Sequence, residues 1–187
     1  MFLCCAAVEG YGYDIYRLNH DLAGAVKIVA GLRGCCGQMD IQALDGDVYA
    51  AENSRGRVVR FDRDGEEVAS WGKRDRKSVE GFGSCCNPMN VRLMPDGTVY
   101  TSEASLGRIK RFSPDGEFLG LVGTADIVPG CKHVALGVSP DGESVFLLDI
   151  TRSQITVLKQ RTEAEEDVAE QEEQMNDTIP GIIGGIF

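Results

Sequence analysis

The cysteines are the residues of this chain whose type and spacing are best suited to chemistry. Seven cysteines are present, and six of them stand in adjacent pairs at positions 4/5, 35/36 and 85/86. Five cysteines share one phase of an internal repeat, with two methionines and a histidine close by: Cys35, Cys36, Met39, Cys85, Cys86, Met89, Cys131 and His133. Thiolate, thioether and imidazole groups are ligands for soft metals, and neighbouring thiols also form disulfides.

Three interpretations of these cysteines stay open. They could be small apolar packing residues on crowded strands, as we expect for Cys4 and Cys5. They could form disulfides, which an oxidising compartment favours. They could also hold a soft metal or a haem-type group, although adjacent cysteines chelate a single zinc ion poorly. The weak candidates for such a metal site are Cys36, Cys86, Cys131 and His133.

Two further groups of charged residues are candidates for function. An acid recurs once in each repeat, at Glu9, Glu52, Glu103 and Asp149. Because it recurs in every copy, we interpret this acid as structural and not catalytic. A longer connecting segment at 72–83 carries four bases, Lys73, Arg74, Arg76 and Lys77. It is predicted either to dock an anionic ligand or partner or to be an ordinary solvated loop.

These residues are placed by a repeat with a period of about 43–51 residues. Each copy contains Asp-Gly turns flanked by short apolar runs, beginning at Asp45, Asp96 and Asp141, and this pattern predicts hairpins. A second Asp-Gly turn follows at Asp64 and Asp115. Each unit is therefore expected to hold four short strands, as does one blade of a β-propeller.

The best-preserved copy resembles an NHL repeat. From Pro88 to Leu119 it reads Pro-x-x-Val, then Pro-Asp-Gly-x-Val-Tyr-x-x-Glu, then Gly-Arg-Ile-x-Arg-Phe-x-Pro-Asp-Gly-x-Phe-Leu. The resemblance implies an all-β, NHL-type propeller that has six blades when complete. At this period a six-bladed ring needs about 270 residues, so the chain supplies only part of one. We expect a fragment of a longer product rather than two copies that complete a ring, and open blade edges predict self-association.

The predicted organisation is a body of propeller blades at 1–158, with an incomplete first blade, and an acidic tail at 159–187. The tail contains eight acids and two bases and is expected to be helical or disordered. In a propeller the segment before each innermost strand lies at one face, near the axis. The five cysteines of shared phase are therefore expected to converge around the mouth of the axial channel.

Composition excludes some classes of function. The net charge is −10, and sequence-independent nucleic-acid binding needs clustered lysine and arginine, so nucleic acid is disfavoured as a partner. No apolar run is long enough to predict a membrane span. The first residues do not form a signal peptide, although an exported or periplasmic full-length product is suspected from the cysteine content.

The favoured function is a non-catalytic binding or scaffold propeller that recognises a protein, a peptide or a small ligand at its axial face. One alternative is a metal-dependent hydrolase or lyase, because the resemblance extends to metal-dependent lactonases. Another alternative is a redox or soft-metal site built from the repeated cysteines. The sequence requires no cofactor, and a three-histidine zinc site cannot be built from this chain alone, because it has only His20 and His133.

Overall fold

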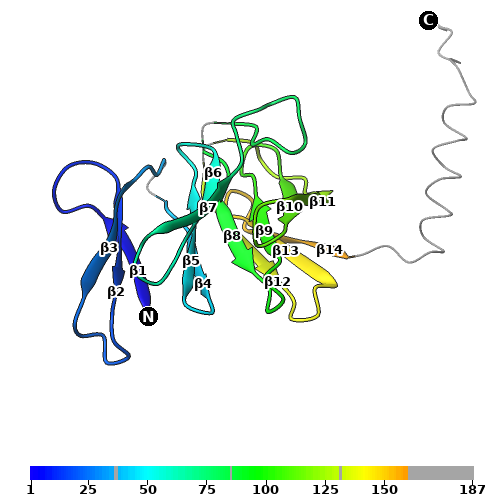
Figure 1. Cartoon of the computed structure of the whole chain (residues 1–187). Coiled ribbons are helices and arrows are strands. Elements are labelled where there is room, and N and C mark those ends of the chain that lie inside the picture. Colours follow the sequence, from blue (N-terminus) through cyan, green and yellow to red (C-terminus); the bar gives the residue numbers. More distant parts are fainter. Residues whose placement is uncertain (36–37, 85, 131, 160–187) are drawn as a thin grey trace, which may run out of the picture.

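The computed structural model describes residues 1–35, 38–84, 86–130 and 132–159, and the described residues form fourteen strands and no helix (Figure 1). The first sheet contains β1 (Phe2–Ala6), β2 (Tyr13–Arg17) and β3 (Val26–Leu32). The second contains β4 (Ile41–Leu44), β5 (Asp47–Glu52), β6 (Arg57–Phe61) and β7 (Glu67–Trp71). The third contains β8 (Asn90–Leu93), β9 (Val99–Ser102), β10 (Arg108–Phe112) and β11 (Phe118–Thr124). The fourth contains β12 (Val134–Val138), β13 (Ser144–Asp149) and β14 (Gln154–Lys159).

Every sheet is an antiparallel meander whose strands follow chain order. Asp45 and Gly46 join β4 to β5 with positive φ angles of 52° and 97°. Two successive positive φ angles match the twist of a tight hairpin, and this conformation is open to glycine and tolerated by aspartate. The local turn chemistry thus produces the hairpins that the Asp-Gly pairs predict.

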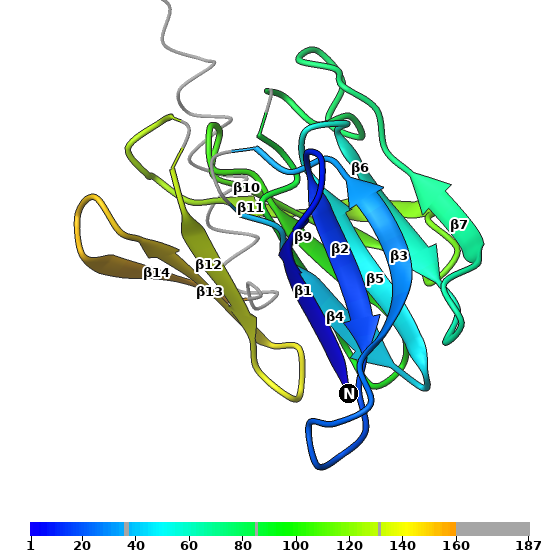
Figure 2. The ribbon, with the colours of Figure 1, turned by 90° about the vertical axis from the view of Figure 1, so that its left-hand side faces the viewer.

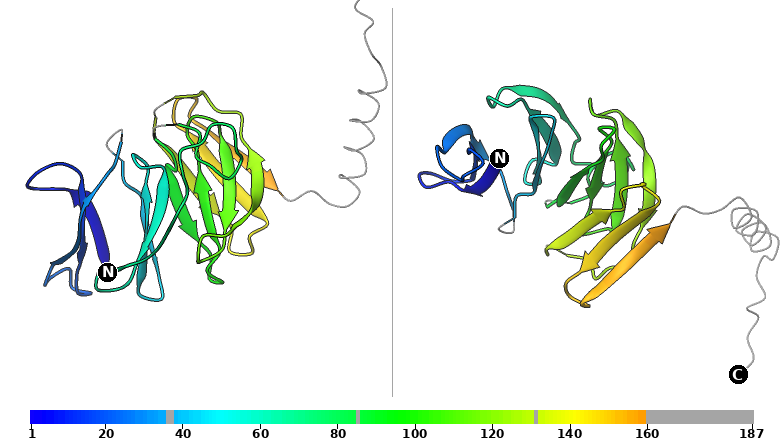
Figure 3. Two further views of the ribbon diagram at one scale, coloured as in Figure 1. Left: turned by 45° about the horizontal axis from the view of Figure 1, so that its top comes forward. Right: turned by 90° about the horizontal axis from the view of Figure 1, so that it is seen from below.

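The four sheets follow one another along an arc when the molecule is seen from below (Figure 3), and Figure 2 shows the first sheet in front of the second. A cluster of buried apolar side chains fills each space between neighbouring sheets. Val48 and Ala50 of β5 pack toward the first sheet, whereas Tyr49 and Ala51 pack toward the third. Because both faces are covered, β5 is apolar without alternation. The prediction of an all-β, partial propeller is confirmed.

The first and fourth sheets have three described strands each. β1 occupies the second position of a blade, as β5 does, because Cys4 pairs with Ile15 of β2 just as Ala51 pairs with Val58 of β6. Apolar side chains of the fourth sheet are exposed on the face turned away from the third, namely Phe146, Ile155 and Val157. The described part of the chain holds no helix long and apolar enough to cross a membrane.

The expectation that Glu9 is equivalent to the other repeated acids is wrong. Glu9 is exposed in the loop between β1 and β2. The strand pairing instead places Cys5, opposite Asp14, where the second sheet has Glu52 opposite Arg57. The loop after β1 is longer than the loop after β5, so an alignment without gaps shifts Glu9 out of register. The acidic tail from residue 160 onward lies outside the described residues.

Candidate functional site at the axial face

Among the described strands, the innermost strand of a blade has one edge that pairs with no other strand. Side chains of the neighbouring blade bind backbone groups on this edge of β8. Asp40, just before β4, accepts a hydrogen bond from Val91 N at 3.1 Å. Gln42 of β4 accepts another from Leu93 N at 2.9 Å. An unpaired backbone group costs free energy when it is removed from water, so these contacts close the inner edge of β8.

Arg92 ties three inner strands together. Its Nε donates to Leu136 O of β12 at 2.6 Å, and its Nη1 lies 3.2 Å from Oδ2 of Asp40. The same Oδ2 accepts from Asn90 Nδ2 at 3.2 Å. The side chains of Asp40 and Arg92 are 18% and 28% exposed, so this ion pair borders solvent at the axis.

A second group of polar side chains lies closer to the mouth. Nδ1 of His133 is 2.5 Å from Oε1 of Gln38, and Nε2 of Gln38 donates to Met89 O at 3.4 Å. The buried Asn53 donates to Gln38 O at 3.2 Å, and its Nδ2 lies 3.9 Å from the Met89 sulfur. Residues from the second, third and fourth blades therefore meet around Gln38.

Two of the predicted cysteines meet at this mouth. The Sγ atoms of Cys35 and Cys86 are 3.0 Å apart, and they come from the segments that precede β4 and β8. Cys35 is partly exposed, whereas Cys86 is 1% exposed. Cys36, Cys85 and Cys131 lie outside the described residues. Met39 is separated from this contact, because it packs in the cluster between the first and second sheets.

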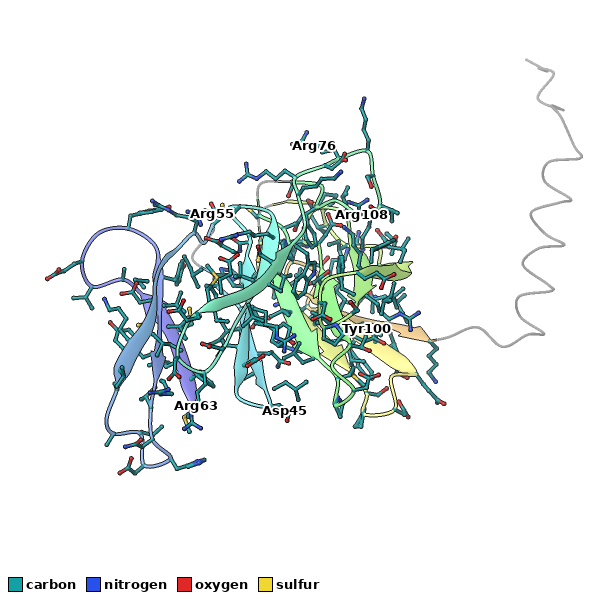
Figure 4. The ribbon with its side chains drawn as sticks, viewed as in Figure 1. Asp45, Arg55, Arg63, Arg76, Tyr100 and Arg108 are labelled. Atoms are coloured by element: carbon teal, nitrogen blue, oxygen red, sulfur yellow. The ribbon has the colours of Figure 1, made fainter. Side chains whose placement is uncertain are left out.

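The basic segment 72–83 is anchored at several points, and its four bases are exposed. The Arg74 guanidinium donates to Ser54 O, and the Arg74 backbone forms a parallel bridge with Phe82. Asp75 accepts the backbone N–H groups of Lys77 and Ser78, which lowers its pKa. Figure 4 places Arg76 at the same end of the sheets as Arg55 and Arg108, opposite Asp45 and Arg63. The four bases thus belong to an anchored segment. None of the contacts seen among described residues joins them to the cysteines.

The acids Glu52, Glu103 and Asp149 are buried and hold the connections between blades. They accept backbone N–H groups from Arg33 at 2.9 Å, Gly83 at 2.7 Å and Val128 at 2.8 Å, respectively. Each also contacts a base, namely Arg57 at 2.6 Å, Arg108 at 2.8 Å and Lys132 at 2.5 Å. The Lys132 contact and backbone donors hold the pKa of Asp149 well below its usual range. This geometry supports a structural role for all three acids.

Sequence reasoning missed most of the axial polar residues. Gln38, Asp40 and Arg92 belong to no motif, although Asp40 and Asn90 stand at one position of the repeat, each beside an apolar strand. A polar residue recurring at the start of an inner strand was the available signal. It could not show that Asp40 reaches the next blade, because that contact spans 51 residues.

Within the part of the chain that the structure describes, the axial side chains form no site for a divalent cation. Among the described residues, no group of three or more His, Cys, Asp and Glu side chains could hold a metal ion. The Oδ1 atoms of Asn53, Asn87 and Asn90 already accept hydrogen bonds from Cys35 N, Ala104 N and Ser102 Oγ. We therefore derive no step through a metal.

No protein-family model matches the chain. A stretch of 108 residues is 30% identical to the adipocyte plasma membrane-associated protein of Danio rerio, covering 56% of this chain and 26% of that protein. The protein of the same name from Salmo salar is 26% identical over 111 residues, with the same coverage. The chain thus spans about a quarter of the length of the curated relatives it matches.

Solved structures show the same fold at low sequence identity. A protein of unknown function from Desulfotomaculum acetoxidans has a TM-score of 0.57 at 17% identity, covering 88% of this chain and 50% of its own. A Bacteroides fragilis protein described as a candidate 6-phosphogluconolactonase has a TM-score of 0.56 at 16% identity, covering 89% and 50%. A chain of the nidogen/laminin complex has a TM-score of 0.55 at 16% identity, covering 83% and 55%. These likenesses support the β-propeller fold.

Proposed function

We propose that the chain forms part of an NHL-type propeller hydrolase that acts on a small lactone at its axial mouth. The protein from Bacteroides fragilis that is described as a candidate 6-phosphogluconolactonase supports this class of reaction by fold alone. The observation in this chain that carries the proposal is the hydrogen bond between Gln38 and His133 at the mouth.

The bond determines which nitrogen of His133 is basic. Nε2 of Gln38 donates to Met89 O, so Oε1 faces the imidazole and accepts a hydrogen bond from Nδ1–H. The other ring nitrogen, Nε2, then keeps its lone pair in the neutral histidine. An exposed imidazole fixed in this tautomer is suited to be a general base.

In the proposed reaction, His133 Nε2 takes a proton from a water molecule that attacks the lactone carbonyl. The ring C–O bond breaks, and the proton returns from His133 to the leaving alkoxide. The product is a hydroxy acid, so one water is consumed and no electrons are exchanged.

The test is hydrolysis of glucono-1,5-lactone, measured with a pH indicator after subtraction of the spontaneous rate. We expect His133→Gln to lower the catalysed rate by about 100-fold or more. The matched control is His20→Gln, because His20 lies at the opposite end, beside a cavity also lined by Gly46 and Arg63. Control activity should equal that of the unaltered chain.

Absence of catalysed hydrolysis, both without added metal and with Ca²⁺, Mg²⁺ or Zn²⁺, would contradict the proposal. Equal activity of the two histidine variants would contradict the role of His133. The first result would favour the binding module, in which Asp40, Gln42 and Arg92 are engaged in contacts between inner strands. Recognition of a protein, peptide or small ligand and self-association through open blade edges stay predictions, and native mass spectrometry tests both.

A further inference from the structure

The contact between Cys35 and Cys86 joins two blades at the mouth of the axis. Their sulfur atoms are 3.0 Å apart, although 51 positions separate them in the sequence. A disulfide bond is about 2.0 Å long, so the two atoms need to approach by only about 1 Å. We propose that Cys35 and Cys86 are an oxidation site, at which a low-molecular-weight disulfide such as oxidised glutathione cross-links the second and third blades. The proposal does not depend on the hydrolase activity.

The backbones on both sides of the contact are held in place. Cys35 N donates to Oδ1 of Asn53 at 2.7 Å, and Cys35 O accepts from Gln38 N at 3.3 Å. Asn87, next to Cys86, is buried and accepts from Ala104 N at 2.9 Å. These hydrogen bonds hold the backbone near each cysteine. The two sulfur atoms are therefore brought together by the folded arrangement of the blades.

The two thiols differ in access, which sets the order of the chemistry. Cys35 is partly exposed and can meet a reagent from solvent, whereas Cys86 is buried. The Cys35 thiolate attacks the reagent disulfide, forms a mixed disulfide and releases one reagent thiolate. The Cys86 thiolate then attacks the Cys35 sulfur and releases the second. The protein loses two electrons and two protons, and the reagent becomes two thiols.

The cross-link would stiffen the mouth next to the proposed base. Gln38, two residues before Asp40 and three after Cys35, contacts both Met89 and His133. A bond between Cys35 and Cys86 therefore fixes the segment that carries Gln38 against the third blade. It also closes a loop of about 50 residues, which restricts the unfolded chain.

The first experiment treats the unaltered full chain with oxidised glutathione and measures its intact mass. We expect a loss of about 2 Da that is reversed by dithiothreitol. Digestion without reduction, followed by fragmentation of the linked peptides, should place the bond between Cys35 and Cys86. The melting temperature should rise by about 5 °C or more on oxidation. A bond found between other cysteines, or a pair that stays fully alkylatable, would overturn the proposal.

Two matched double variants separate this pair from the cysteines next to it in sequence. Cys36→Ser/Cys85→Ser keeps the proposed pair and should still lose about 2 Da and gain thermal stability. Cys35→Ser/Cys86→Ser should show neither the loss of mass nor the gain in thermal stability. Cys4 is a suitable internal control, because burial raises the pKa of its thiol to about 12 and disfavours the reactive thiolate. The opposite pattern in the two variants would reject the assignment.

Discussion

The second and third sheets share strand order and the position of a buried acid, but they bury charge differently. In the second sheet, Glu52 pairs with Arg55 and Arg57, whose side chains are 50% and 25% exposed. In the third, Glu103 pairs with Arg108, which is 14% exposed, and with Lys110, which is fully buried. Val59 takes the place of Lys110 in the second sheet.

The difference is explained by the segment 72–83 that packs on the third sheet. Lys110 Nζ lies 2.7 Å from Oε1 of Glu103, donates to Gly81 O at 2.5 Å and stands 4.4 Å from the ring centroid of Phe82. Burial lowers the pKa of the Lys110 ammonium, and Glu103 opposes that shift. A buried cation thus anchors a long connection that the second sheet lacks.

The largest expected effect comes from removing the acid of the third sheet. Glu103→Ala should lower the free energy of unfolding by about 3–5 kcal/mol, because it leaves Lys110 buried without its carboxylate. Glu52→Ala should cost about 1–3 kcal/mol, because its arginine partners can reach water. Urea denaturation of both variants measures the difference, and equal losses would remove the distinction between the sheets.

A second substitution sharpens this test. Lys110→Met gives the third sheet an apolar side chain where the second sheet has Val59. In the Glu103→Ala background it should restore about 1–3 kcal/mol, because no unpaired buried cation remains. If the double variant is as unstable as the sum of the single losses, Lys110 is not the source of the cost.

The fourth sheet extends the comparison to acid pH. The hydrogen bond from Lys132, with backbone donors, lowers the pKa of Asp149 below the value of the unfolded chain. The stability from Asp149 is therefore present above the unfolded pKa of about 3.9 and is lost as pH falls through the lowered folded value. We expect Asp149→Asn to be less stable than the unaltered chain at neutral pH. Its melting temperature should also fall less steeply as the pH is lowered.

The control for that prediction is Asp126→Asn in the preceding connection. The Asp126 side chain is 91% exposed and pairs with Arg152 at 3.0 Å. The melting temperature of Asp126→Asn should fall with decreasing pH as steeply as that of the unaltered chain. If Asp149→Asn also leaves the pH dependence of the melting temperature unchanged, a special role for the buried carboxylate is contradicted.

The smallest effect is expected at the outer side of segment 72–83. Lys73 is 70% exposed and lies 3.9 Å from Asp75. Lys73→Ala should change the free energy of unfolding by no more than about 0.5 kcal/mol, because exposed ion pairs contribute little. Chemical denaturation checks this value. A loss above about 1 kcal/mol would show that the exposed bases, and not Lys110, hold the segment.

Much of the fold follows from local patterns in the sequence. The Asp-Gly pairs at 45/46 and 64/65 join β4 to β5 and β6 to β7, where turn chemistry predicts hairpins. Val58 and Ile109 occupy one apolar position of the repeat, and both are fully buried. Glu9 is the failure of this reasoning, because a repeat aligned without gaps cannot detect a lengthened loop.

The site was partly predictable for the same reason. Cys35 and Cys86 belong to cysteine pairs that share one phase of the repeat, and a propeller brings this phase of neighbouring blades to one face, where the two sulfur atoms meet. The Gln38–His133 contact spans 95 residues and joins one position of the repeat in two different blades, where the residue type does not recur. No local pattern identifies such a pair.

The sequence by itself determined the strands, their turns and the recurrence that produces a propeller, because these depend on residues close together in the chain. Tertiary structure decided which charges are buried and which side chains meet at the axis. Lys110 has the sequence signature of a surface strand residue, and only the packing of segment 72–83 removes it from water. Desolvation and contacts between blades depend on several distant segments at once, so they are settled only when the blades come together.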